Sequence, residues 1–386
     1  YASKDVPLAG FPIKAADQYI IRLVKTNRKV AVCEQLEEPS ASVKLVKRGV
    51  VEVITPGTIM RESLLTEKEN NYIAAMKSSG ERTSLAVSDI STGEMYSVDF
   101  EDIYSAKDYL TKLSPSEILT DSKIRETSDL NVREIDKSYF DLNDATQSLC
   151  GHFNAKSVED AGLDGRNELS VRSAGALIAF LKETQNKSLS QIKSIKIKYL
   201  KDRMYIDYQT IRNLEVFERM NGEKENSFVK IIDRTKTPMG ARSIRNLMRS
   251  PFNDIKEIND NLNLVEKFLS SAQSAKDLQK MLSEVGDIER INTRIAARRA
   301  YPRDLVLLLE AVKRLPSVKE ILRKIGQENM IADYEKFAPA ADTIEKALDK
   351  EKVLDNQKER YFKKGFSEVY DELMELSTNT SGMIFR

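Results

Sequence analysis

The sequence has few of the residues that build disulfides, zinc sites and histidine-based catalytic centres. Its 386 residues include two cysteines, Cys33 and Cys150, and one histidine, His152. Two cysteines cannot form a disulfide framework, and this favours a reducing compartment. A single histidine argues against a zinc cluster and leaves little room for histidine-based catalysis.

Long apolar runs and nucleotide-binding loops are also missing. No run approaches the roughly 20 apolar residues that a membrane span requires, and no charged-then-apolar leader opens the sequence. The pattern Gly-x-x-x-x-Gly-Lys-Ser/Thr does not occur, so no loop is predicted to hold the phosphates of ATP. We therefore expect no catalytic residues, no metal, no cofactor and no ATP hydrolysis in this chain.

The composition is that of a folded chain of two or three domains, with 41% hydrophobic and 31% charged residues. The net charge is +1, but residues 1–56 carry nine Lys or Arg against six Asp or Glu, a local net charge of +3. Such clusters can engage phosphates even in a near-neutral protein, although a solvated, ion-paired surface is an equally open interpretation. Lys44, Lys47 and Arg48 form one such cluster.

The residue pattern changes along the chain from mixed α/β to helical. Residues 15–27 predict an amphipathic helix with Tyr19, Ile20, Leu23 and Val24 on one apolar face, followed by a buried strand at 30–33. Between 72 and 119 strands alternate with a helix, and Ser91-Thr92-Gly93 is typical of a hairpin turn. From about residue 201 nearly every segment has helical periodicity, including one predicted over Asp207–Asn221, and Pro251, Pro302 and Pro316 mark predicted corners.

Several short motifs occur in a fixed order. They are Val6-Pro7-Leu8-Ala9-Gly10-Phe11-Pro12, Val32-Cys33-Glu34-Gln35-Leu36, Val53-Ile54-Thr55-Pro56-Gly57-Thr58, Asp233-Arg234-Thr235-Lys236-Thr237-Pro238-Met239-Gly240-Ala241-Arg242 and Val285-Gly286-Asp287-Ile288-Glu289-Arg290. Together they resemble the motifs of the MutS family of DNA mismatch-recognition proteins. Because the chain begins at Tyr1 without an initiator methionine and ends at Arg386 without a nucleotide-binding motif, we expect it to be the middle of a larger protein.

The resemblance implies a multidomain fold that is α/β plus all-α. Residues 1–56 correspond to the C-terminal part of a mixed α/β mismatch-binding domain, and residues 57–200 to a ribonuclease-H-like α/β connector domain. Residues 201–370 correspond to a helical core or lever domain, and residues 371–386 to the truncated start of the clamp. In this family the core relays ATP-dependent movement to the parts that hold DNA.

The resemblance also implies a DNA-binding surface near the start of the chain. The family places its Pro-Leu-Ala-Gly loop beside the minor groove, so Leu8, Ala9 and Gly10 are expected to contact DNA, Gly10 by allowing close backbone approach. Lys14 stands where these proteins often carry a Tyr-His pair and could meet a phosphate, as could Lys44, Lys47 and Arg48. The family's mismatch-wedging phenylalanine is missing from Tyr1–Asp5, so specific mismatch recognition is expected to be impaired.

Partners and cofactors follow from the resemblance alone. The intact parent is expected to be a dimeric ATPase that uses ATP and magnesium outside this chain, to bind mismatched double-stranded DNA, and to meet a MutL-type partner through the connector. A cytoplasmic, nucleoid-associated protein of a bacterium or archaeon is implied.

Two alternative functions and two structural expectations complete the predictions. Asp89 lies where nucleases of the connector's fold hold a metal, which leaves a ribonuclease-H-like nuclease as an alternative, although two-metal hydrolysis needs several converging carboxylates. A meiotic MutS relative that binds DNA junctions is a second alternative.

Cys150 and His152 are expected to be packing residues. Arg290, Arg294 and Arg298 form a predicted basic stripe, expected to pair with acidic helices rather than DNA.

Overall fold

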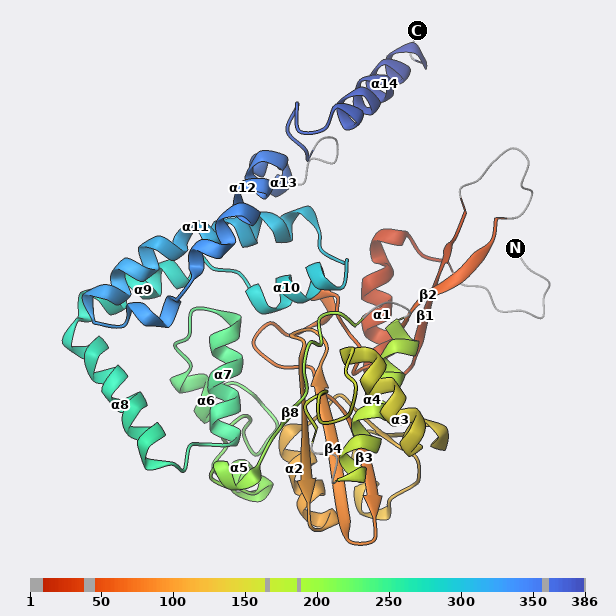
Figure 1. The fold of residues 1–386 in the computed structure, drawn as a ribbon, viewed down its shortest axis with the longest axis vertical. Helices are drawn as coiled ribbons and strands as arrows, with labels where there is room; N and C mark the ends of the chain where they lie inside the picture. The colour runs from red at the N-terminus through yellow and green to blue at the C-terminus, as the bar shows by residue number, and fades with distance from the viewer. Residues whose placement is uncertain (1–9, 38–45, 164–166, 186–188, 356–360, 385–386) are drawn as a thin grey trace. The chain divides into compact units, whose positions relative to one another are not determined.

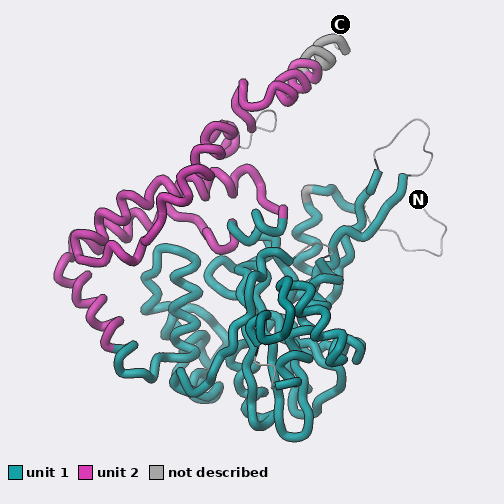
Figure 2. Tube along the Cα trace, viewed as in Figure 1, with its two compact units in different colours: residues 1–258, 292–297 teal, residues 259–291, 298–386 magenta. Residues whose placement is uncertain are grey.

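The computed structural model describes residues 10–37, 46–163, 167–185, 189–355 and 361–384. The chain folds into two compact units (Figure 2). The first unit comprises residues 1–258 and 292–297, and the second comprises residues 259–291 and 298–386. Among the helices in the described ranges, none is both long and apolar enough to cross a membrane.

A short α/β segment opens the first unit (Figure 1). Its elements are the 3-10 turn η1 (Ile13–Ala15), α1 (Ala16–Lys25), β1 (Val30–Gln35) and β2 (Arg48–Ile54), with β1 and β2 paired antiparallel. Ile20 and Val24 of α1 pack against Ile54 of β2. Tyr19 and Leu23, predicted on the same apolar face, are 41% and 47% exposed. The buried stripe is narrower than predicted, because a two-stranded ribbon covers only one row of the helix.

A six-stranded mixed sheet forms the centre of the first unit. Its strands are β3 (Ile73–Ser79), β4 (Arg82–Asp89), β5 (Glu94–Phe100), β6 (Glu117–Thr120), β7 (Val132–Glu134) and β8 (Lys196–Ile197), in the order β7-β6-β3-β4-β5-β8. The first three strands form an antiparallel meander; β6 is parallel to β3 and β7 is parallel to β6. The sheet is mixed, as the α/β pattern of this part of the sequence predicted. Strand β8, which the sequence did not predict, pairs parallel with β5.

Helices cover both faces of this sheet. They are α2 (Ile103–Leu113), α3 (Leu142–Phe153) and α4 (Glu168–Gln185). Because alternate strand residues point to opposite faces, Ile73 and Ala75 join a core cluster with α3 and α4, whereas Ala74 and Met76 join a cluster with α2. Gly175 lets α4 approach α3 closely, since a Cβ added there would lie 2.4 Å from the Cα of Ala145.

Three short helices complete the first unit: α5 (Tyr208–Asn213), α6 (Phe228–Ile232) and α7 (Pro238–Arg249). Asp207 caps α5, and Thr237 caps α7 through a hydrogen bond from the N–H of Gly240. Helix α5 ends eight residues before Asn221, where the sequence predicted its end. Glu215 adopts a left-handed backbone with φ of 49°, which a continuing helix cannot contain.

The second unit is helical, as predicted for this part of the chain. Its helices are α8 (Ile255–Ser270), α9 (Ala272–Leu282), α10 (Ile288–Ala296), α11 (Pro302–Lys324), α12 (Ala338–Ala347), α13 (Lys350–Leu354) and α14 (Glu368–Ile384); α8 and α10 are each divided between the two units. Val306 of α11 packs with Ala347 and Val353 in a small core. Pro316 was predicted at a corner, but it lies inside the continuous helix α11. Apolar packing along α11 outweighs the loss of one backbone hydrogen bond.

Candidate nucleic-acid interface

Two of the predicted DNA-contacting residues, Lys47 and Arg48, lie on the ribbon formed by β1 and β2. Arg48 begins β2 and is paired with Gln35 of β1, while the carbonyl of Lys47 accepts a 2.8 Å hydrogen bond from the N–H of Leu36. Their backbones are therefore fixed, while both side chains are exposed. Adjacent cations on a fixed ribbon can hold phosphates without reading base sequence.

The ribbon is buried at one end and exposed at the other. Ile54 is 1% exposed, whereas the exposed residues of β2, Arg48 and Val50, lie at its other end. The predicted burial of β1 is wrong, because each of its residues is exposed or half-buried. Helix α1 packs on the ribbon through Ile20 and Val24, and α4 also contacts β2. The exposed side chains of Lys47 and Arg48 remain accessible to a ligand.

The structure describes some of the other residues that were predicted to contact DNA and leaves others out. Leu8, Ala9 and Lys44 lie outside the described residues. Gly10 is exposed, and among the described residues beyond its chain neighbours a Cβ placed there would meet no atom within 4 Å. Packing inside the protein thus does not require a glycine at this position. Lys14 lies in η1, at the start of the helical segment.

An exposed aromatic pair lies next to Gly10 and was not among the predicted contacts. The rings of Phe11 and Tyr19 stack with centroids 4.6 Å apart, and the guanidinium of Arg22 lies 5.7 Å from the Tyr19 centroid. Phe11 is 49% exposed. Stacked rings beside a cation suit contact with sugars, bases and phosphates. The three-residue spacing of Tyr19 and Arg22 could have indicated that their side chains meet on a helix. The hydrophobic pattern instead predicts Tyr19 on the apolar face.

Arg61 fixes α1 and β2 to the chain that follows them. Its guanidinium pairs with Asp17 of α1 at 2.7 Å and with Glu52 of β2 at 3.0 Å. The hydroxyl of Ser63 also donates to Asp17 at 2.8 Å. Burial opposes ionisation of Asp17, but the Ser63 and Arg61 hydrogen bonds outweigh it and hold the pKa of Asp17 below its ordinary value. The candidate interface is thus held by an ionised cluster.

Asp89 is a structural residue of the β4 turn. It is fully buried, and its Oδ2 accepts hydrogen bonds from the side chain of Asn70 at 2.9 Å and the N–H of Asn71 at 3.1 Å. Its Oδ1 accepts from the N–H and hydroxyl of Ser91 at 2.9 and 2.6 Å. Four donors occupy the carboxylate, and across the described part of the chain no group of three His, Cys, Asp or Glu could hold a metal. This geometry does not favour a nuclease.

Cys150 and His152 lie on α3 and are each partly buried. The Nε2 of His152 lies 2.9 Å from the carbonyl of Ile192, and its ring contacts Phe153. Burial lowers the pKa of His152, so its neutral form is favoured. These contacts fit the packing role expected for this pair.

The three arginines of the predicted basic stripe do not share one face. Arg290 is 3% exposed and lies 3.8 Å from Asp287, and Arg294 is 5% exposed and lies 3.4 Å from Glu62. Helix α10 ends at Ala296, so Arg298 lies beyond it, with a left-handed φ of 54°. The predicted ion pairing is confirmed for Arg290 and Arg294. The predicted stripe does not include Arg298, because this residue lies beyond the end of the helix.

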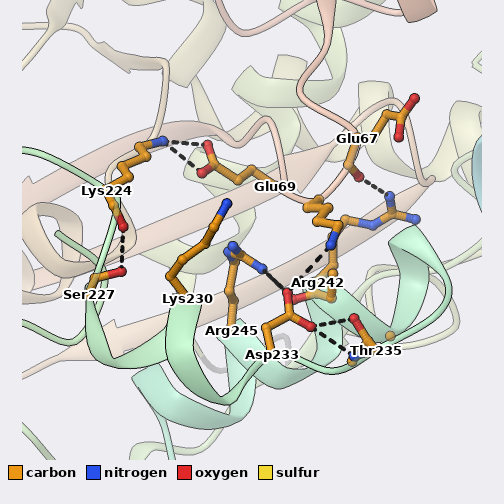
Figure 3. A network of polar contacts seen from close by, with 12 residues as sticks. Glu67, Glu69, Lys224, Ser227, Lys230, Asp233, Thr235, Arg242 and Arg245 are labelled. Carbon is orange, nitrogen blue, oxygen red and sulfur yellow. Dashed lines mark hydrogen bonds and ion pairs between the residues drawn. The ribbon is translucent and has the colours of Figure 1, made fainter.

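The Asp233–Arg242 motif builds the start of α7 (Figure 3). The carboxylate of Asp233 accepts from the N–H of Thr235 at 3.0 Å and pairs with Arg245 at 3.2 Å. Its hydrogen bonds to Thr235 and Arg245 outweigh the effect of burial and lower the pKa of Asp233. At Gly240, an added Cβ would lie 3.2 Å from the Thr237 hydroxyl oxygen, so the first turn of α7 has little room for a larger side chain.

The same network ties α7 and the preceding loop to the segment before β3. Arg242 donates to the carbonyl of Glu67 at 2.9 Å, and the ammonium of Lys224 contacts both oxygens of Glu69 at 2.7 and 2.9 Å (Figure 3). Lys68 lies 3.9 Å from Asp233. The motif residues therefore join α7 to the segment before β3.

Comparison with protein-family models identifies three successive matches. MutS domain I matches residues 1–63, MutS domain II matches residues 71–193, and MutS domain III matches residues 209–379.

Curated relatives align over almost the whole chain. A protein named DNA mismatch repair protein MutS from Caldanaerobacter subterraneus subsp. tengcongensis is 32% identical over 98% of this chain and 45% of its own length. Proteins of the same name from Chlorobaculum parvum and Methanosarcina mazei are each 32% identical, over 97% and 98% of this chain and 44% and 45% of their own lengths. The chain thus spans a little under half the length of these relatives.

Proposed function

Because the chain belongs to the MutS family of DNA mismatch repair proteins, we propose that it contacts duplex DNA and relays movement within a mismatch-recognition protein. The observation that carries the proposal is the ordered match to MutS domains I, II and III. The exposed cations of the β1–β2 ribbon, in the segment that matches domain I, give that proposal a physical site.

The DNA contact is electrostatic and independent of sequence. Lys47 and Arg48 hold phosphates from the ribbon, and Lys44, Lys14 and the loop at Leu8, Ala9 and Gly10 extend the same contact. The Phe11–Tyr19 pair adds a surface on which a sugar or base can rest. A protein that must work at any sequence requires this kind of binding.

The relay depends on fixed connections rather than on a reactive group. The Arg61 cluster connects α1 with β2, and the Asp233 network connects α7 with the segment before β3. A charged group with several hydrogen-bond partners holds the elements that it joins in one fixed arrangement. Movement of one element is then passed on to the next. This supports residues 57–200 as a connector and residues 201–370 as a lever, with residues 1–56 as the DNA-binding part and 371–386 as the start of a clamp.

In the intact protein, we place ATP, magnesium and ATP hydrolysis outside this chain. The absence of a phosphate-loop pattern from the sequence supports this assignment, and we propose that the chain itself is not an enzyme and holds no cofactor. A MutL-type partner on the connector, a homodimer, mismatched DNA as the ligand and a cytoplasmic, nucleoid-associated location complete the proposal for the whole protein. No observation favours the nuclease or the junction-binding alternative.

The test is DNA binding by the purified chain, measured by fluorescence anisotropy with a labelled duplex over a range of salt concentrations. We expect binding that weakens steeply with salt. Matched and mismatched duplexes should bind equally, because Tyr1–Asp5 provides no phenylalanine wedge. Tight, salt-resistant binding that discriminates mismatched from matched duplex would contradict the proposal.

A further inference from the structure

A small cationic cavity lies in the first unit, away from the ribbon that carries Lys47 and Arg48. Its volume is about 110 Å³, and three tyrosines and three cations line most of it: Tyr72, Tyr96, Tyr109, Lys112, Lys198 and Arg249. The tyrosines and lysines come from the sheet, α2 and the segment after β8, and the arginine comes from the last turn of α7. The cavity therefore lies where the sheet meets α7.

The cations of this cavity lie close to one another. The ammonium groups of Lys112 and Lys198 are 5.8 and 5.6 Å from the centroid of the same ring, that of Tyr109, and Lys198 also lies 3.3 Å from the Tyr109 hydroxyl. Arg249 donates to the side-chain oxygen of Asn246 at 3.3 Å. Its Nε is buried and has no hydrogen-bond partner among the described residues.

The cavity has more cations than carboxylates. Glu94 also lines it and accepts a 3.4 Å hydrogen bond from Tyr72. Asp108 accepts from the hydroxyl of Tyr205 and the N–H of Tyr208.

Burial and neighbouring charges shift the pKa values of the groups that line the cavity. Burial lowers the pKa of Lys198 and of Arg249, and neighbouring cations lower that of Lys198 further against the opposing effect of Glu94. Burial also raises the pKa of Tyr109 to about 12, which keeps its hydroxyl neutral. Three cations beside one carboxylate leave an excess of buried positive charge, and a bound anion would offset its desolvation energy.

Size and chemistry limit which anion can fit. At roughly 30 Å³ per water, the cavity has room for about three waters or for one tetrahedral oxyanion. It adjoins a larger cavity of about 650 Å³, and the two share Tyr72, Lys112, Leu113 and Arg249 as lining residues. An ester group on the anion could extend into that space.

We propose that this cavity binds phosphate, either as the free ion or as the end group of a phosphomonoester. Lys112 and Lys198 hold the anion from the sheet side and Arg249 holds it from α7, with Nε of Arg249 among its donors. The bound anion bridges the sheet and α7, and so strengthens the junction that the Asp233 network also holds. This site is independent of the proposed contact with DNA.

Isothermal titration calorimetry of the whole chain with inorganic phosphate tests the proposal, with sodium chloride at equal ionic strength as the reference. One phosphate should bind per chain. Glycerol phosphate in a parallel titration distinguishes the two sources: tighter binding than phosphate assigns the site to a phosphomonoester, and weaker binding assigns it to the free ion. Absence of saturable heat for both ligands would overturn the proposal.

Matched lysine variants locate the site. Lys198→Met removes one cation of the cavity and should weaken phosphate binding roughly tenfold or more, since a charged hydrogen bond is lost. Lys201→Met removes an exposed lysine three residues away and should leave binding unchanged. Thermal unfolding gives a second measure, since phosphate should raise the Tm of the wild type and of Lys201→Met but not of Lys198→Met. Equal effects of phosphate on all three proteins would contradict the assignment, and the wild-type titration decides the matter if Lys198→Met fails to fold.

Discussion

The guanidinium of Arg61 lies 2.7 Å from the carboxylate of Asp17, and this ion pair is the central contact of the segment that carries the candidate interface. The same guanidinium contacts Glu52, whose side chain is 9% exposed. One arginine therefore fixes both α1 and β2. Its removal deletes the contacts that join α1 and β2 to the chain after them, and this makes Arg61 a direct probe of how firmly the ribbon is held.

Arg61→Leu should lower the free energy of unfolding by about 1–3 kcal/mol, because hydrogen bonds to charged groups contribute that much. Arg82→Leu is the matched control: Arg82 pairs with Glu101 at 3.5 Å, and both side chains are at least 75% exposed. That variant should change stability by less than about 0.5 kcal/mol. Urea unfolding followed by circular dichroism measures both, and equal effects of the two substitutions would contradict the anchoring role of Arg61.

The contribution of Asp17 should depend on pH in a defined direction. Its pKa is lowered in the folded protein, so its stabilising effect is present above the pKa of the unfolded chain and is lost as pH falls through the folded value. The difference in unfolding free energy between wild type and Asp17→Asn should therefore be largest near neutral pH and shrink in acid. A difference that stays constant down to about pH 3 would show that ionisation of Asp17 does not hold the cluster.

Two glycines on adjacent helices should respond to alanine with opposite signs. Gly175→Ala brings a methyl group within 2.4 Å of Ala145 and should destabilise the protein by about 1–3 kcal/mol. Gly151 of α3 is exposed, and its added methyl group would meet nothing within 4 Å, so Gly151→Ala should stabilise by up to about 1 kcal/mol. Thermal unfolding separates the two, and a neutral Gly175→Ala would refute the close packing of α3 and α4.

Asp89 should matter for folding and not for catalysis. Asp89→Asn places an amide donor opposite the donors of Asn70 or Ser91 and should cost about 1–3 kcal/mol of stability. The wild-type chain incubated with duplex DNA and magnesium or manganese should leave the DNA intact. Cleavage that Asp89→Asn abolishes would instead support the nuclease alternative.

Much of the fold was predictable from local pattern. Apolar residues in the strands and the Ser91-Thr92-Gly93 turn indicated the meander β3–β4–β5. The helical periodicity of the hydrophobic residues indicated the change to helices near residue 201. Strand β8 was missed because two residues carry no periodic signal. Pro316 was misplaced because neighbouring residues pack the helix on both sides of it, which a local rule about proline does not take into account.

The candidate site was predicted less completely than the fold. Clustering of charge along the sequence located Lys47 and Arg48, since exposed cations in a short ribbon stay close in space. The stacking of Phe11 on Tyr19 depends on how the chain turns before α1, which no spacing rule specifies. The sequence did not indicate a role for Arg249 either, because the residues around it come from segments that are far apart in the sequence, such as Tyr72, Lys112 and Lys198.

The salt dependence of DNA binding by Lys47→Ala/Arg48→Ala tests the central claim most directly. Each lost phosphate contact should reduce the slope of log K against log salt by about 0.9, so the double variant should lose roughly two units of slope. Lys123→Ala, an exposed lysine of the domain II match, serves as the control and should keep the wild-type slope. The account predicts this contrast; a double variant that binds duplex DNA with the wild-type affinity and slope would contradict it.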